Sequence, residues 1–101
     1  MIRVIMERCC KTGKERALQG LLEDLRASAM RQPGYITGET LVSMDDPSYH
    51  LVISTWSHLG AWKAWEDSEE RHQILQLIGC CLIEEPRVRV YGVPAGELVT
   101  L

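Results

Sequence analysis

The stretch 49–72 constrains the fold of this 101-residue chain more than any other. Its first part, 50–56, is rich in β-branched and aromatic residues, which favour a β-strand. Ser57 then provides a polar helix-start signal, and the helical segment that follows carries Trp62 and Trp65. The sequence therefore predicts a strand and a helix that converge, with Trp56 at the end of the strand as the third tryptophan.

The composition is that of an ordinary globular domain, with 46% hydrophobic and 25% charged residues. We expect one α+β domain over 1–101, small enough for association to add to its stability. The net charge of -3 argues against a nucleic-acid partner, because phosphate binding needs a clustered positive patch. Neither a membrane span nor a signal-peptide pattern is present in the sequence, so we expect a cytoplasmic protein without a membrane partner.

The four cysteines occur as two adjacent pairs, Cys9-Cys10 and Cys80-Cys81. The spacing C-x-x-C that favours zinc is absent from the sequence. Neighbouring residues on a strand also point to opposite faces, so the simplest interpretation is small packing residues. Redox or metal chemistry is the alternative.

Periodicity along the rest of the chain predicts four strands and two helical regions. The first helix is expected to begin at a capping box formed by Thr12 and Glu15, and to end at 32–34. The second is expected to open near His58, to kink or restart near Ser68, and to run to about Leu82. The expected strands are 2–10, 35–43, 50–56 and 87–93.

The resulting order β-α-β-β-α-β is that of the ferredoxin-like fold, an antiparallel sheet with both helices on one face. The other face of such a sheet needs a partner if it is apolar. We assign Ile2, Val4 and Met6 to this bare face, and Arg3 and Glu7, together with Cys9, to the face toward the helices. An apolar bare face and the apolar tail 97–101 predict a homodimer.

The spacing W-S-x-x-x-A-W-x-x-W, from Trp56 to Trp65, resembles the antibiotic-biosynthesis monooxygenase family. The element order agrees over essentially the whole chain, and the residue signal is concentrated in 34–86. The resemblance implies ferredoxin-like domains that pair, sheet against sheet, into a dimeric α/β barrel. It also implies a small-molecule pocket between the sheet and the helices of each subunit. Some members of the family oxidise polyketides or quinols without a cofactor, and others degrade haem.

On this resemblance, Trp62 and Trp65 are expected to bind a flat aromatic substrate of phenol, quinol or polyketide type. A base, His72, His50 or Glu7, would take its phenolic proton. The resulting electron-rich anion passes an electron to dioxygen, so neither a flavin nor a metal is needed. The alternative is that both tryptophans are simply core residues and that the histidines have no catalytic role.

A second alternative is the haem-degrading branch, which uses an asparagine on the first strand and a histidine ten residues after the tryptophan. Glu7 and Leu75 stand at those places here, and His72 lies one helical turn earlier. We therefore rank cofactor-independent oxidation above haem degradation. The third alternative is a dimer that only binds a small molecule or serves as a structural module, because the sequence contains no motif of another enzyme class.

Overall fold

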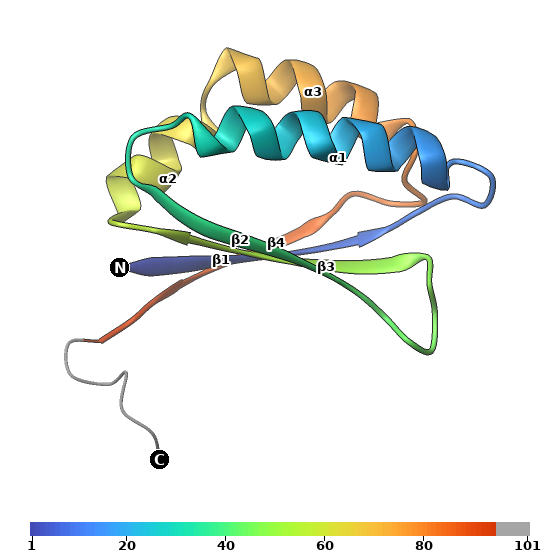
Figure 1. Ribbon diagram of the computed structural model, residues 1–101, viewed down its shortest axis with the longest axis horizontal. Helices are drawn as coiled ribbons and strands as arrows, with labels where there is room; N and C mark the ends of the chain where they lie inside the picture. Colours follow the sequence, from blue (N-terminus) through green and yellow to red (C-terminus); the bar gives the residue numbers. More distant parts are fainter. Residues whose placement is uncertain (95–101) are drawn as a thin grey trace.

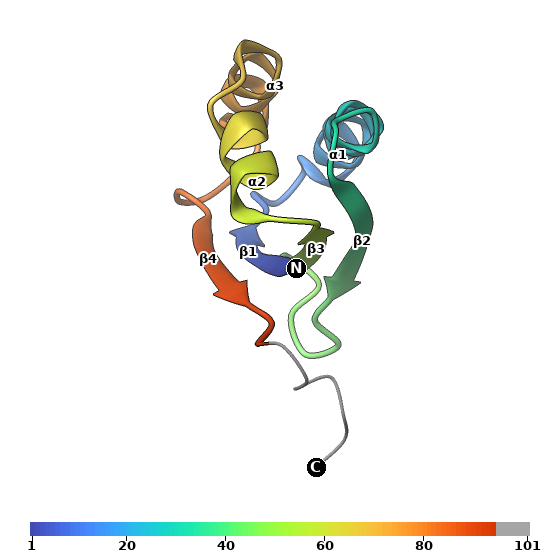
Figure 2. The ribbon, with the colours of Figure 1, turned by 90° about the vertical axis from the view of Figure 1, so that its left-hand side faces the viewer.

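The computed structural model describes residues 1–94, and these form a sheet covered by helices on one face (Figures 1 and 2). The elements in chain order are β1 (Ile2–Cys9), α1 (Glu15–Met30), β2 (Tyr35–Val42), β3 (Tyr49–Trp56), α2 (Leu59–Glu66), α3 (Glu69–Gly79) and β4 (Arg87–Gly92). The strands pair antiparallel in the order β2-β3-β1-β4. The predicted ferredoxin-like arrangement is confirmed. The predicted tail 97–101 lies outside the described residues.

The assignment of the two faces of β1 was wrong. Ile2, Val4 and Met6 are buried on the side of the sheet that the helices cover, and Val4 is completely inaccessible to solvent. Arg3 and Glu7 therefore lie on the opposite side, which we call the open face. Alternation shows that a strand has two unlike faces. It does not say which of them the crossover helices will cover.

The open face is mixed in character. Its β1 residues, Arg3, Ile5, Glu7 and Cys9, lie opposite Thr55, Ile53, Leu51 and Tyr49 of β3. The register with the edge strands adds Glu39 and Leu41 of β2, and Arg87, Arg89 and Tyr91 of β4. An apolar centre around the cross-strand pair Ile5 and Ile53 is thus flanked by charges of both signs.

The start of α1 differs from the expected capping box. The residue at the N-cap is Lys14, whose side chain makes no capping hydrogen bond. The Glu15 carboxylate instead accepts a hydrogen bond from the N–H of Gly13 (3.2 Å). Gly13 has φ = +87°, which glycine adopts at little cost, and the turn leaves Thr12 outside the helix.

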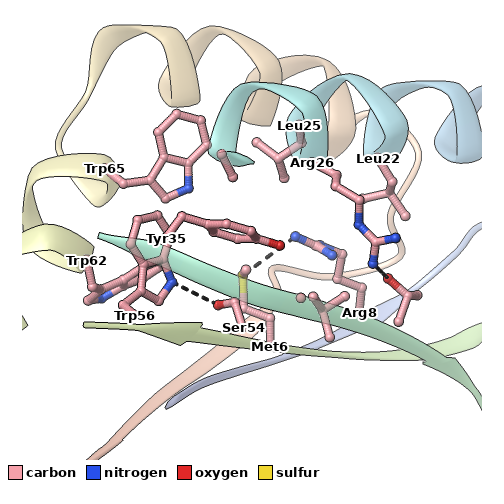
Figure 3. A pocket seen from close by; sticks show the side chains of 14 residues that line it. Met6, Arg8, Leu22, Leu25, Arg26, Tyr35, Ser54, Trp56, Trp62 and Trp65 are labelled. Atoms are coloured by element: carbon pink, nitrogen blue, oxygen red, sulfur yellow. Dashed lines mark hydrogen bonds between the residues drawn. The ribbon is translucent and has the colours of Figure 1, made fainter. Parts of the chain in front are cut away.

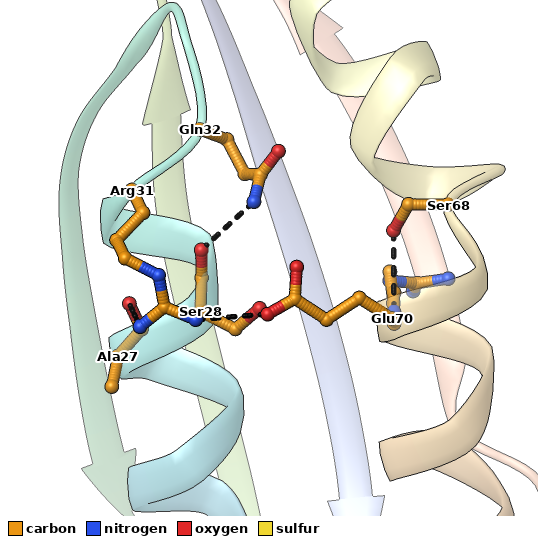
Figure 4. A network of polar contacts seen from close by, with 7 residues as sticks. Ala27, Ser28, Arg31, Gln32, Ser68 and Glu70 are labelled. Atoms are coloured by element: carbon orange, nitrogen blue, oxygen red, sulfur yellow. Dashed lines mark hydrogen bonds and ion pairs between the residues drawn. The ribbon is translucent and has the colours of Figure 1, made fainter.

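The predicted restart near Ser68 is confirmed, because α2 ends at Glu66 and α3 begins at Glu69. The Ser68 hydroxyl oxygen accepts from the Arg71 N–H (3.2 Å), and the same hydroxyl donates to the Trp65 carbonyl (2.8 Å). Near this break an ion pair between Arg31 and Glu70 (2.8 Å) joins α1 to α3 (Figure 4). Both of its side chains are exposed, so it contributes little stability.

The second helical leg is shorter than expected. It ends at Gly79, and the chain then turns so that Cys10 and Leu82 form an isolated bridge. Ile78 and Cys81 are buried, whereas Leu77 is 58% exposed and does not belong to the core. Within 1–94 we find no helix that is both long and apolar enough to cross a membrane.

We predict that Ser68→Ala lowers the free energy of unfolding by about 1 kcal/mol, because the first turn of α3 loses its cap. Urea unfolding followed by circular dichroism measures this. The matched control is Thr12→Ala, whose side chain caps no helix and should change stability by less than about 0.5 kcal/mol. Equal losses for the two variants would contradict the capping role of Ser68.

Candidate functional site

A hollow lies between the helix-covered face of the sheet and the helices α1 and α2 (Figure 3). We call it the tryptophan pocket. Its cavity volume is small, about 60 Å³, and it opens to solvent. It is lined by Met6, Arg8, Leu22, Leu25, Arg26, Ala29, Tyr35, Gly38, Thr40, Val52, Ser54, Trp56, Trp62 and Trp65.

Aromatic side chains form one end of the tryptophan pocket. Tyr35 and Trp56 meet edge to face with ring centroids 5.3 Å apart, and Trp56 meets Trp62 at 5.8 Å. The indole N–H of Trp56 donates to the Ser54 hydroxyl (3.1 Å), which satisfies its polar atom. Trp65 projects from α2 on the helix side of the pocket (Figure 3). Trp62 and Trp65 therefore lie together beside the pocket, as predicted, although they are also buried core residues.

Tyr35 reaches into the pocket because Gly38 leaves room for it. A Cβ atom at residue 38 would collide with the Tyr35 hydroxyl. The register irregularity of β2 lies between Tyr35 and Thr37, and at Gly38 the close approach is made by the Tyr35 side chain.

The floor of the pocket holds a buried cation, Arg8. Its side chain is 2% exposed, its Nε has no hydrogen-bond partner, and its Nη2 meets only the weak acceptor Sδ of Met6 (3.5 Å). Within residues 1–94 it forms no ion pair with a carboxylate. Burial, and secondarily the charge of Arg71, lowers the Arg8 pKa from its ordinary value to about 10. The protein thus keeps an uncompensated guanidinium in a site of low dielectric constant.

Sequence reasoning missed Arg8 as a pocket residue. Arg8 and its neighbour Glu7 point to opposite faces of β1, so the Glu7 carboxylate is not available to Arg8. The signal was nevertheless present, since Arg8 continues the alternating series of Ile2, Val4 and Met6. A charged residue on the otherwise apolar face of a strand is a candidate for ligand binding.

Of the three expected bases, His50 lies nearest to this arrangement. It pairs with Arg8 across β1 and β3, and its buried Nδ1 has no hydrogen-bond partner. It borders a wider hollow, the His50 groove, lined by Glu15, Gln19, Leu22, Glu23, Arg26, Thr40, Val42, Pro47 and His50. The two hollows meet at Leu22, Arg26 and Thr40, where the Arg26 side chain donates to the Thr40 hydroxyl (3.3 Å).

Glu7 and His72 lie elsewhere. Glu7 is on the open face, where its carboxylate raises the pKa of Tyr49 by accepting the phenolic hydrogen bond. His72 is exposed on α3 and does not line the tryptophan pocket. Because α2 ends at Glu66 and α3 begins at Glu69, Trp65 and His72 do not lie on one continuous helix. The third histidine, His58, caps α2 by accepting from the Ala61 N–H (3.1 Å).

All four cysteines are free thiols, and Cys10 and Cys81 are buried. Burial raises the pKa of the Cys10 thiol, which disfavours the reactive thiolate. Within residues 1–94, three or more His, Cys, Asp or Glu side chains do not gather in a way that could hold a metal ion.

Comparison with known proteins identifies the family. The sequence model described as antibiotic biosynthesis monooxygenase matches residues 1–77, more than half of the chain. The chain belongs to the antibiotic biosynthesis monooxygenase family. A search of curated proteins returns no match.

Solved structures of this family share the fold. SnoaB, a cofactor-independent oxygenase from Streptomyces nogalater, superposes in one of its variants with a TM-score of 0.83 at 11% identity, covering 91% of each chain. A structure described as antibiotic biosynthesis monooxygenase gives 0.83 at 20% identity, covering 93% of this chain and 100% of its own. A conserved protein from Methanosarcina mazei Go1 gives 0.84 at 21% identity, covering 89% of each chain. At these identities the similarity establishes the fold alone.

We predict that Arg8→Met stabilises the ligand-free protein. The folded-state pKa of Arg8, about 10, lies well below its ordinary value, so burial of the charge costs stability at every pH below about 10. The cost falls only as the pH rises above about 10, where the folded state releases its proton before the unfolded state does. Allowing for imperfect packing of Met, we expect a net gain of about 1–3 kcal/mol at pH 7.

Urea unfolding at pH 7 measures this gain. The matched control is Arg16→Met, which removes the same charge from the exposed surface of α1 and should change stability by less than about 0.5 kcal/mol. A clear loss of stability in Arg8→Met would show that the guanidinium has a compensating partner in solution.

Proposed function

We propose that this protein is a cofactor-independent monooxygenase that oxidises a flat aromatic molecule of phenol, quinol or polyketide type with dioxygen. The observation that carries this proposal is the tryptophan pocket itself. It joins an aromatic end at Trp62 and Trp65 to a buried cation at Arg8, inside a fold of this family. Aromatic walls favour a planar ring, and a buried cation favours an oxygen that can lose its proton.

The chemistry needs only a base and a dry pocket. Transfer of the phenolic proton to a base leaves an electron-rich anion, which passes one electron to dioxygen. The two radicals combine at a ring carbon that bears one hydrogen, and the peroxide formed takes back the proton from the base. Loss of water from this hydroperoxide then leaves a carbonyl at that carbon. One oxygen atom stays in the product and the other leaves as water, and the substrate supplies all the electrons.

His50 is the base that we favour among the three candidates. Its imidazole lies on the helix-covered face beside Arg8, and its buried Nδ1 is free to accept a proton. Glu7 on the open face and His72 on the outside of α3 are separated from the tryptophan pocket by the sheet and by the helix layer. The role of each remains a prediction for mutagenesis.

We predict that the protein consumes oxygen with hydroquinones or anthrones, and that His50→Ala lowers kcat by about 10²–10⁴ with little change in binding. Trp65→Ala should weaken binding instead, because it loses about 0.5–1.5 kcal/mol of ring stacking in addition to buried area. Oxygen-electrode kinetics and fluorescence titration separate the two effects. Glu7→Gln and His72→Ala provide the comparison for the assignment of the base.

Three outcomes would contradict the proposal or its assignment of the base. If His72→Ala or Glu7→Gln lowers kcat more than His50→Ala does, the base is not His50. If wild type neither binds nor oxidises any compound of these classes, the non-catalytic dimer becomes the better account. Tight haem binding with a spectrum that changes on His72→Ala would favour haem degradation.

We further propose a homodimer in which two open faces pack against each other. Ile5 and Ile53 are cross-strand partners at the centre of this face, and their neighbours Leu41 and Leu51 extend the apolar area. The surrounding Arg and Glu residues could pair across a two-fold axis. This arrangement leaves the tryptophan pocket on the outer side of each sheet.

We predict that Ile53→Asp dissociates the dimer, because it places a charge at the centre of an apolar interface. Sedimentation velocity at micromolar concentration should show a dimer for wild type and a monomer for the variant. Leu77→Asp, at an exposed apolar residue on α3, is the control and should remain dimeric. A well-folded wild-type monomer would exclude the proposed dimer.

A further inference from the structure

The tryptophan pocket has a charge imbalance that its own residues do not correct. Its lining includes two arginines, Arg8 and Arg26, and none of its lining residues is an aspartate or a glutamate. A third arginine, Arg71, stacks on the far side of the pocket wall, 5.2 Å from the ring centroid of Trp62. Arg71 is close enough to Arg8 to disfavour its charge further. The pocket is therefore a site of positive potential.

Arg8 differs from the other two arginines in lacking a partner of its own. Arg26 is exposed and donates to Thr40, and Arg71 donates to the backbone carbonyl of Glu66 (3.3 Å). Arg8 has five N–H donors, and the weak contact to the Met6 sulfur is the one hydrogen bond that they make within the described residues. A guanidinium nine-tenths buried and aimed into a cavity is ready to bind an oxyanion.

A second donor is directed into the same part of the pocket. Figure 3 shows the Tyr35 hydroxyl and the Arg8 guanidinium pointing toward one another across the pocket. Gly38 provides the space that places this hydroxyl there. An anionic oxygen between the two would accept from both, while its ring lies toward the aromatic end at Trp56 and Trp65.

A partner subunit would not supply the missing negative charge. In the proposed dimer the second sheet packs on the open face, whereas Arg8 projects from the opposite face of β1. Residues 1–94 thus provide no carboxylate for Arg8 in the monomer or in this dimer, and an anion that enters the pocket from solvent would complete the site.

We propose that the tryptophan pocket binds its aromatic ligand as an oxyanion, a phenolate or enolate whose oxygen is held by Arg8 and Tyr35. This inference rests on the proposed function and specifies its substrate class: acidic hydroxyaromatic compounds in their ionised form. Binding breaks the O–H bond of the ligand, and the proton leaves to His50 or to water, with no change of oxidation state. Because the anion is the form that reacts with dioxygen, the pocket would promote the reaction by selecting that form.

The test uses 4-nitrophenol, a single-ring probe that ionises near neutral pH and whose phenolate is yellow. Titration with wild type at a pH just below the probe's own pKa should increase the yellow colour. The bound probe's pKa should fall by at least about one unit, a tenfold preference for the anion. The methyl ether 4-nitroanisole has the same ring but cannot ionise, and should bind at least about tenfold more weakly.

Three variants complete the experiment. Arg8→Met should abolish the colour change and make the two probes bind equally, while circular dichroism and unfolding show that it is folded. Arg8→Lys keeps the charge and should restore part of the preference. Arg16→Met removes an exposed charge on α1 and should behave as wild type. A carboxylate probe, 4-nitrobenzoate, distinguishes a general anion site from one shaped for a phenolate: weaker binding than 4-nitrophenol supports the proposal.

The result that overturns the inference is equal binding of 4-nitrophenol and 4-nitroanisole by wild type, or a colour change that persists in Arg8→Met. Failure of every probe to bind overturns it as well, and stronger binding of 4-nitrobenzoate would assign the site to carboxylates. The oxyanion site and the oxygenase reaction can be disproved independently of each other. If wild type prefers the anion but consumes no oxygen, the oxyanion site is supported and the oxygenase reaction is disproved. If wild type consumes oxygen but shows no preference for the anion, the reaction is supported and the oxyanion site is disproved.

Discussion

The contact on which the rest of this structure depends is the chain of rings formed by Tyr35, Trp56 and Trp62. It joins β2, β3 and α2, three elements that come from different parts of the sheet and the helix layer. The helix α2 has only eight residues, too few to be stable in isolation, so packing of its tryptophans must hold it. The same rings form the end of the tryptophan pocket, and core stability and ligand shape therefore have a common source.

Arg8 has the opposite effect on stability to this aromatic core. Packing of the rings stabilises the folded protein, whereas burial of the Arg8 charge destabilises it. A buried cation without a carboxylate partner is unusual in a domain of this size, where net stability is a few kcal/mol. Methionine at the same position would avoid the cost of burying the charge. Such a trade-off between stability and activity is typical of binding sites, and it sets Arg8 apart from Arg26, which is solvated at the rim.

Membership of the antibiotic biosynthesis monooxygenase family explains the fold, but it does not by itself identify the reaction. Structures with TM-scores above 0.8 share less than a quarter of their residues with this chain. What a member of the family does must then be decided by the side chains that line its own pocket. Here these are an aromatic end, a buried guanidinium, and a histidine in an adjoining groove.

Much of this protein could be predicted from local sequence patterns. Short-range periodicity and capping chemistry placed four strands, the order β-α-β-β-α-β and the helix restart at Ser68, because these depend on residues a few positions apart. The three tryptophans could be assigned to one region for the same reason. The predicted capping box at Thr12 failed where a glycine turn moved the helix start.

Only the tertiary structure decided which face of β1 the helices cover. Alternation separates the face with Ile2, Val4, Met6 and Arg8 from the face with Arg3, Ile5 and Glu7. It does not show which of the two faces is buried. Once the helices lie over the first set, Arg8 becomes a buried pocket residue and Glu7 moves to the open face. In the same way the angle between α2 and α3 separates His72 from Trp65. The sequence by itself determined the elements and their order, and long-range packing determined which side chains meet, because no local pattern records the side on which a crossover helix will pack.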